Sequence, residues 1–249
     1  MKILAINGSD RKNGTFSKIL KLLDGAYSIE ILNLSDYKLE PCSGCRTCFV
    51  KGINRCPLKG DYRTIFDKMI AADGVIFYSP TYVLNVSGLM KNFIDRFSFL
   101  CYDYVFINKP ALLIASAREI GTKLTLFNLE NAVSSWKFDV IGKFEYKTLE
   151  ASTSAGYESK KGTELKKVMK KFYHALKSKK AKKPSMTDLV NFRILKYGFE
   201  INDDLKFYKK VWEKNGLLEK RADYYFNARI NLLKKLTAEI LFRLLIHFI

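Results

Sequence analysis

The sequence opens with Met1-Lys-Ile-Leu-Ala-Ile-Asn-Gly-Ser-Asp-Arg-Lys-Asn-Gly-Thr-Phe-Ser17, where a short apolar run leads into a polar turn that contains glycine. Residues 2–7 predict a β-strand, and residues 17–23 carry Ile19, Leu20, Leu22 and Leu23 at helical spacing. A strand, a glycine turn and a helix in this order are typical of the first unit of an α/β domain. The opening stretch therefore predicts a parallel sheet that begins at the second residue.

The same alternation of strands and helices continues to about residue 183. Short apolar runs predict four more strands, at 30–34, 74–79, 110–116 and 138–144, and helical spacing predicts helices at 62–72, 89–97, 122–135 and 162–183. The third strand is apolar throughout, as expected of a strand that is covered on both faces. The pattern predicts a doubly wound, five-stranded parallel sheet that binds its ligand at the carboxyl ends of the strands.

Polar residues follow the first and third predicted strands, where such a sheet would bind a ligand. Residues 7–17 combine an amide, hydroxyls and two cations, which suits a phosphate group, although an ordinary capped turn has a similar composition. The turn lacks G-x-x-x-x-G-K-[ST] and G-x-G-x-x-G, which argues against a nucleoside triphosphatase and against a dinucleotide Rossmann site. Residues 79–88 contain Pro80, Tyr82 and Asn85, which suit a planar heterocycle or form a plain loop.

Four of the five cysteines lie within fifteen residues. Cys42, Cys45, Cys48 and Cys56 have the spacing C-x2-C-x2-C-x7-C, and Cys101 lies elsewhere. Four cysteine thiolates in a run of this kind hold iron–sulfur clusters. A four-cysteine zinc site is the nearest alternative, although it more often uses two separated C-x2-C pairs, and a loop without metal is the third. The compact spacing favours a [4Fe–4S] cluster.

Composition and charge narrow the class of protein. The 249 residues are 48% hydrophobic, which allows a substantial core, and no apolar stretch reaches the roughly 18 residues that span a bilayer. The sequence opens without a signal-peptide pattern, so the clustered cysteines indicate metal or redox chemistry in a reducing cytoplasm. The net charge of +18 is uneven, with +5 in residues 1–150 and +13 in residues 151–249. No nucleic-acid-binding motif accompanies the basic part, which argues against a nucleic-acid partner.

The back of the chain differs from the front. A basic run ending at Pro184 predicts a linker, and so a domain over residues 1–183, with the cysteine loop 42–56 inside it, and a helical extension over 184–249. Residues 232–249 have a single narrow polar stripe on an otherwise apolar helix, formed by Lys235, Glu239, Arg243 and His247. We expect so broad an apolar face to be covered by its own domain or by a homodimer, or to lie in a membrane surface.

Together these segments resemble the NADPH-dependent FMN reductases of flavodoxin-like fold, and the cysteine run is similar to that of the iron–sulfur flavoproteins. The resemblance covers about residues 1–175 and rests on residues 8–14, 79–82 and 90–96 and on the four cysteines. It implies FMN as cofactor and a [4Fe–4S] cluster. The implied phosphate contacts are Ser9, Arg11, Lys12, Asn13, Gly14, Thr15 and Ser17; the implied flavin-ring contacts are Pro80, Thr81, Tyr82, Asn85 and Ser116; the implied metal ligands are Cys42, Cys45, Cys48 and Cys56.

The resemblance also implies a function. We expect an FMN-dependent oxidoreductase that passes electrons between the flavin and the cluster, with NAD(P)H as a candidate donor and a redox protein or small molecule as acceptor. One alternative is an NAD(P)H-dependent FMN or quinone-type oxidoreductase without a cluster, and a third is a basic membrane-surface or nucleic-acid adaptor. We assign no catalytic acid or base, because His174 and His247 both lie in the helical back part. We expect a homodimer or a higher homo-oligomer.

Overall fold

The computed structural model describes residues 1–23, 25–178 and 180–247. The chain forms two compact units. The sheet unit comprises Met1–Ser43, Leu58–Cys101 and Val105–Lys180, and the loop–extension unit comprises Gly44–Pro57, Tyr102–Tyr104 and Ala181–Ile249. Most of the predicted cysteine loop thus belongs with the C-terminal extension.

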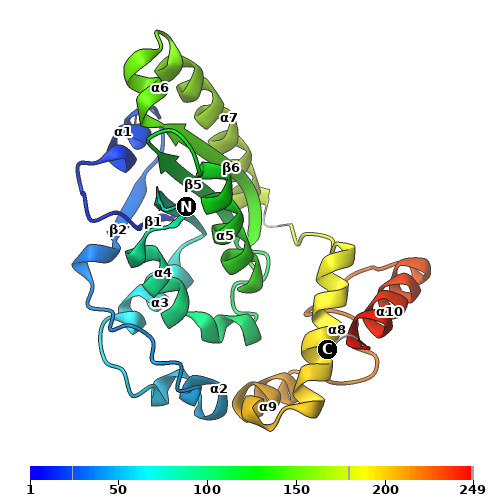
Figure 1. The fold of residues 1–249 in the computed structure, drawn as a ribbon. Helices are drawn as coiled ribbons and strands as arrows, with labels where there is room; N and C mark the ends of the chain where they lie inside the picture. Colours follow the sequence, from blue (N-terminus) through cyan, green and yellow to red (C-terminus); the bar gives the residue numbers. More distant parts are fainter. Residues whose placement is uncertain (24, 179, 248–249) are drawn as a thin grey trace. The chain divides into compact units, whose positions relative to one another are not determined.

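The sheet unit contains a parallel sheet with the strand order β2-β1-β3-β5-β6 (Figure 1). This order is that of flavodoxin-like folds and confirms the predicted fold class. The strands are β1 (Ile3–Asn7), β2 (Ile29–Asn33), β3 (Gly74–Tyr82), β5 (Pro110–Ala117) and β6 (Asp139–Lys147). The predicted count of five is one too low, because β4 (Asn85–Val86) adds a short antiparallel strand by pairing with Thr81 and Tyr82 at the end of β3.

Helices cover both faces of the sheet. Alternate residues of β1 point to opposite faces, as the two-residue period of a strand requires. Ile3 and Ala5 pack in one core with residues of α1 (Thr15–Lys21) and α7 (Tyr157–Ser178). On the other face Phe77 meets Phe93 and Trp136, with ring centroids 6.4 and 6.2 Å apart. This face carries α3 (Tyr62–Ala71), α4 (Gly88–Arg96) and α5 (Thr122–Ser135), and the short α6 (Thr148–Thr153) precedes α7.

The loop–extension unit is helical, as predicted for its C-terminal part. It contains α2 (Thr47–Lys51), a 3-10 helix (Ile53–Arg55), α8 (Met186–Ile201), α9 (Lys206–Lys214) and α10 (Leu232–Ile246). Ser185 and Asp188 form a capping box that starts α8, which explains why the chain becomes helical directly after Pro184. Trp212 is fully buried and stacks on Phe192 at 5.3 Å, so an aromatic core holds this unit together.

One helix prediction needs correction. The helix predicted over 162–183 is α7, which begins at Tyr157 and ends at Ser178. Lys179 of the predicted linker, and Phe248 and Ile249 of the predicted last helix, lie outside the described residues. Among the described residues, no helix combines the length and the apolar content that crossing a membrane requires.

The last helix, α10, does not bury its apolar face within its own unit. Leu233 and Leu244 are 74% and 56% exposed, and Ala238 is the buried residue of the helix. Within the polar stripe, Glu239 pairs at 3.2 Å with Arg193 of α8, whereas the Arg243 side chain is 72% exposed. The unit that contains α10 therefore leaves this face exposed, and its cover by a homodimer or by a membrane surface stays a prediction. Its exposed apolar residues, called the leucine face below, are Leu232, Leu233, Leu236, Ile240, Leu241, Leu244 and Leu245.

Candidate functional site

The turn after β1 is shaped by its own side chains. Asn7 is 1% exposed; its Oδ1 atom accepts from the Ser9 backbone N–H at 2.9 Å, and its amide donates to Asn33 at 2.9 Å. The Ser9 hydroxyl accepts from the Arg11 N–H at 3.2 Å, and the Gly14 N–H donates to the Arg11 carbonyl at 3.1 Å. Ser9, Arg11 and Gly14 of the predicted phosphate set therefore lie in a tight turn that is held by hydrogen bonds within the chain.

Ser87 joins this turn to the start of α4. Its hydroxyl donates to the Gly8 carbonyl at 2.6 Å and caps α4 by accepting from the Met90 N–H at 3.2 Å. Gly8 also donates from its N–H to the Tyr78 carbonyl at 2.8 Å, and a Cβ atom on Gly8 would lie 2.9 Å from the Met90 Cβ. The close approach explains why glycine stands here, and it places the turns after β1 and β3 side by side.

The ends of β3 and β5 are joined by the buried Tyr78. Its hydroxyl lies 2.7 Å from the Ser116 Oγ, and its ring stacks on Phe16 with centroids 4.5 Å apart. Burial raises the pKa of the Tyr78 phenol to about 12, and the hydrogen bond with Ser116 opposes this shift only in part. Tyr78 is therefore a neutral hydrogen-bonding group that positions Ser116, and it is a poor proton donor.

The β3–β4 hairpin projects an exposed apolar surface beyond the sheet. Val83 and Leu84 have φ of 49° and 60°, so the hairpin turns through two left-handed residues, and Tyr82 is 55% exposed. The hairpin is held by α5, because Thr81 Oγ1 lies 2.8 Å from Thr125 Oγ1 and Asn128 donates to the Asn85 side chain at 3.0 Å. Exposed aromatic and aliphatic surface at the carboxyl ends of the strands fits a flat ring such as isoalloxazine.

The predicted cations of the phosphate site are exposed. Lys12 pairs with Asp36 at 2.6 Å, and this hydrogen bond lowers the pKa of the Asp36 carboxyl. Arg11 and Asn13 are exposed as well, whereas Thr15 and Ser17 lie partly buried on α1. A phosphate in this turn would have to compete with Asp36 for the Lys12 ammonium.

The structure separates the predicted metal ligands between the two units. Cys42 lies in the sheet unit, whereas Cys45, Cys48 and Cys56 lie in the loop–extension unit. The Cys45 thiol lies 3.4 Å from the Thr47 hydroxyl. Within the part of the chain that the structure describes, no three cysteine, histidine or carboxylate side chains converge as metal ligands.

The backbone of the cysteine loop nevertheless fits a cluster. Gly44, Arg46 and Gly52 all have positive φ, at 68°, 59° and 86°. Turns that alternate between right- and left-handed residues direct backbone N–H groups into concave sites, which many iron–sulfur centres use. Soft thiolates are the donors that iron–sulfur clusters prefer, and Cys45 lies directly between Gly44 and Arg46.

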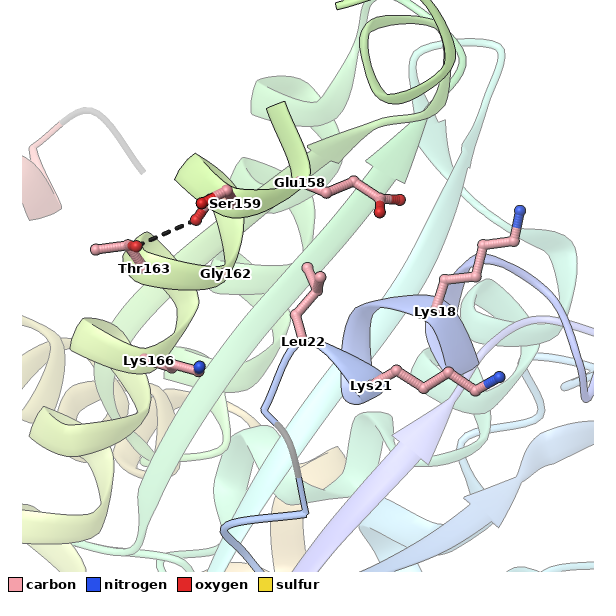
Figure 2. A pocket seen from close by; sticks show the side chains of 8 residues that line it. All are labelled: Lys18, Lys21, Leu22, Glu158, Ser159, Gly162, Thr163 and Lys166. Atoms are coloured by element: carbon pink, nitrogen blue, oxygen red, sulfur yellow. Dashed lines mark hydrogen bonds between the residues drawn. The ribbon is translucent and has the colours of Figure 1, made fainter. Parts of the chain in front are cut away.

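A separate hollow of about 420 Å³ lies between α1 and α7. Figure 2 shows Leu22 between the two helices, with Lys18 and Lys21 on α1 and Lys166 on α7. None of its lining residues belongs to the predicted phosphate, flavin-ring or metal sets. The hollow is thus distinct from the turns at the carboxyl ends of the strands.

Sequence reasoning missed four polar residues that shape the site. Asn7, Tyr78, Ser79 and Ser87 are all buried at the carboxyl ends of β1 and β3. The position of Ser87, three residues before Met90 at the start of an apolar helix, is the N-cap signal that could have found it. The position of Asn7 and Ser79, at the last predicted strand residues, could have indicated a role at the ligand edge.

The strand order and the turns are those of a flavodoxin-like domain, whose ligand site lies at the carboxyl ends of the strands. The family model for NADPH-dependent FMN reductases matches residues 1–150. An iron–sulfur flavoprotein of Clostridioides difficile is 31% identical over 88% of this chain and 100% of its own length. One of Methanocaldococcus jannaschii is 30% identical over 57% of this chain and 76% of its own. A flavone reductase structure superposes with a TM-score of 0.55 at 17% identity, over 73% of this chain and 65% of that one.

The chain belongs to the NADPH-dependent FMN reductase family, in its iron–sulfur flavoprotein branch. It is a flavin-dependent oxidoreductase with FMN as cofactor, and it exchanges electrons with a redox partner. The family resemblance drawn from the sequence is therefore confirmed, and so is flavin redox function.

Proposed function

We propose that this flavoprotein passes electrons between FMN and a [4Fe–4S] cluster held by Cys42, Cys45, Cys48 and Cys56. One observation carries the proposal: four closely spaced thiols lie on a loop with three residues of positive φ, in a chain of a flavin-dependent family. When bound, FMN takes up a hydride or single electrons, whereas an iron–sulfur cluster passes single electrons. A chain that holds both would convert between two-electron and one-electron chemistry.

The residues of the sheet unit would bind and orient FMN. The turn after β1 would hold the phosphate through hydroxyls, backbone N–H groups and two cations, and the β3–β4 hairpin would hold the ring. Pro80 fixes the backbone, Asn85 offers an amide that α5 already positions, and Tyr82 offers an exposed flat face. The proposed phosphate set is Ser9, Arg11, Lys12, Asn13, Gly14, Thr15 and Ser17, and the proposed ring set is Pro80, Thr81, Tyr82, Asn85 and Ser116.

The chain's own residues would contribute position and electrostatics, and we assign none of them as a proton donor or acceptor. Tyr78 is buried beside the ring set, yet its raised pKa keeps it neutral. The electron donor proposed here is NAD(P)H, and the acceptor is a redox protein or a small molecule in the cytoplasm. Specificity for NADH or for NADPH would depend on the residues that contact the donor.

The experiment is chemical analysis of protein purified without oxygen. We expect FMN, iron and acid-labile sulfide together, and we expect Cys45→Ser to lose the iron and sulfide but to keep the flavin. The second candidate is a flavin reductase without a cluster, which is favoured by the lack of convergence among the described metal-ligand side chains. Flavin without iron in the anaerobic protein would select that candidate.

We propose further that a second copy of the chain covers the leucine face of α10. This face is too apolar to remain in water without risk of aggregation. Deleting residues 230–249 should then reduce the oligomer measured by light scattering and leave the flavin spectrum unchanged. Sedimentation of the intact protein with anionic vesicles at low salt, with release at high salt, would instead support a membrane surface as the partner. An unchanged oligomer after truncation would contradict the dimer.

A further inference from the structure

The C-terminal extension packs on the helix that carries Cys48. In the loop–extension unit α2 contacts α9 and the 3-10 turn that precedes it, and Figure 1 shows α2 beside α9. About 150 residues of sequence separate these segments, so the contact is a tertiary one that the fold has to build.

One contact lies at the C-terminal end of α2, over Gly52. This residue is buried and has φ of 86°, and it stands between Cys48 and Cys56 in the sequence. A Cβ atom on Gly52 would lie 2.7 Å from Cε2 and 2.9 Å from Cζ of Phe207. The Phe207 ring therefore covers the backbone at the point where the chain leaves α2.

A second contact lies at the N-terminal end of α2. Arg46 directly follows Cys45 and has φ of 59°, which is unusual for a residue other than glycine. Its guanidinium pairs with the Asp204 carboxylate at 2.8 Å. A left-handed residue with a side chain persists where neighbouring contacts hold it, and the Arg46–Asp204 pair is such a contact.

Aromatic side chains join the middle of α2 to the core of the extension. Phe49 of α2 meets the Tyr102 ring edge-on at 5.1 Å, and the Tyr102 ring lies 6.1 Å from that of Tyr208. The Trp212 indole N–H donates to the Tyr102 carbonyl at 3.0 Å, and Trp212 is fully buried. The contacts on α2 are thus anchored to a fully buried residue of the unit.

We propose that Asp204 and Phe207 are positioning residues for the cysteine site: they hold the two ends of α2 and thereby fix the backbone around Cys45, Cys48 and Cys56. The inference rests on the proposed cluster function and adds a role for the extension. With the ends of α2 held, the thiols keep their spacing and water is kept from one side of the site. Solvent exposure is one of the factors that set the reduction potential of an iron–sulfur cluster, so the extension also influences that potential.

The first experiment uses the full-length protein without iron, and measures the rate at which each cysteine reacts with iodoacetamide, resolved by peptide mass spectrometry. Asp204→Asn should speed labelling of Cys48 by at most about fivefold, because a half-exposed ion pair contributes little. Phe207→Ala should speed labelling of Cys48 and Cys56 more, by about tenfold, because the ring covers buried backbone. Labelling of Cys101, which belongs to the sheet unit, should not change.

Matched controls lie on the same segment. Asp203→Asn removes the same charge from a carboxylate that is 92% exposed, and Ile201→Ala truncates an apolar side chain that is 64% exposed. Both should label as the natural protein does. The double variant Arg46→Asp, Asp204→Arg should restore slow labelling, since aspartate tolerates positive φ better than most residues. Labelling rates in Asp204→Asn and Phe207→Ala that equal those of the controls would overturn the proposal.

The second experiment uses the protein loaded with iron and sulfide under anaerobic conditions. Phe207→Ala should shift the reduction potential of the cluster, measured by a titration followed by electron paramagnetic resonance, whereas Ile201→Ala should not. If Phe207→Ala loses its far-ultraviolet circular dichroism, and so its helical fold, Phe207→Leu replaces it in this measurement. If the natural protein binds no iron but the variants show the predicted labelling rates, the proposed cluster is contradicted. The positioning role of Asp204 and Phe207 is then still supported. An unshifted potential in every Phe207 variant would contradict the positioning role.

Discussion

Removal of the Ser87 hydroxyl should loosen the junction between the two turns of the flavin site. Ser87 is 2% exposed, caps α4 through the Met90 N–H, and donates to the Gly8 carbonyl at 2.6 Å. Loss of a serine cap costs about 1 kcal/mol, and loss of the donor to a buried carbonyl costs about 1–3 kcal/mol. We therefore expect Ser87→Ala to lower the free energy of unfolding by about 2–4 kcal/mol.

The assay is urea unfolding of the FMN-free protein in a Trp212→Phe background, so that the fluorescence of Trp136 reports on the sheet unit. Ser152→Ala is the matched control, because its hydroxyl also donates to a backbone carbonyl, at 2.8 Å, but is exposed; we expect a change within about 0.5 kcal/mol. FMN affinity should fall with Ser87→Ala, since the Gly8 turn would lose its tie to α4. If Ser87→Ala destabilises the protein no more than Ser152→Ala does, the Ser87 hydroxyl does not stabilise the junction between the Gly8 turn and α4.

Three further predictions concern the cofactor sites. Arg11→Ala combined with Lys12→Ala should weaken FMN binding by about 1.5–3 kcal/mol for each charge-assisted hydrogen bond that is lost. Fluorescence titration measures the affinity, and an unchanged affinity would show that neither residue contacts the phosphate. Cys101→Ser should keep both FMN and iron in metal analysis, because the Cys101 thiol lies 3.3 Å from Ser135 within the sheet unit, so loss of iron would show that it is a ligand. Because the pKa of Tyr78 is raised in the folded protein, the Tyr78 phenol ionises at lower pH in the unfolded chain than in the folded one. The free energy of unfolding should therefore fall as the pH rises from 10 to 12. Tyr78→Phe should remove up to about 3 kcal/mol of this fall, measured by urea titrations at each pH.

The sheet could be predicted from the sequence because local patterns specify it. Residues 74–79 are apolar on both faces, and such a run has few alternatives to a buried strand. The hairpin that follows was missed because its turn residues, Val83 and Leu84, have positive φ without the glycine or asparagine that usually signals such a turn. Its geometry comes from the hold of α5 on Thr81 and Asn85, which sequence spacing does not reveal.

The extension was predicted as helical, but its contacts were not. The packing of Phe207 over Gly52 joins residues that are far apart in sequence, and neither residue carries a signal for the other. For α10, the broad apolar face was expected to be covered, because a helix usually buries its apolar side. Contacts with distant parts of the sequence turn other residues toward α8 instead: Glu239 pairs with Arg193, and Ala238 is buried in a cluster with Leu189. The spacing of residues along α10 does not reveal these partners.

The proposed function requires that electrons pass between the flavin and the cysteine-bound cluster. The most direct measurement is anaerobic photoreduction of the flavin in substoichiometric steps, with the cluster followed by low-temperature electron paramagnetic resonance. With a sacrificial electron donor such as EDTA present, we expect the signal of a reduced [4Fe–4S] cluster to grow as the flavin is illuminated, and we expect Cys45→Ser to reduce its flavin without producing this signal. Electron transfer between the two would be contradicted if the flavin becomes fully reduced while the cluster stays oxidised, at a potential at which chemical reductants do reduce the cluster.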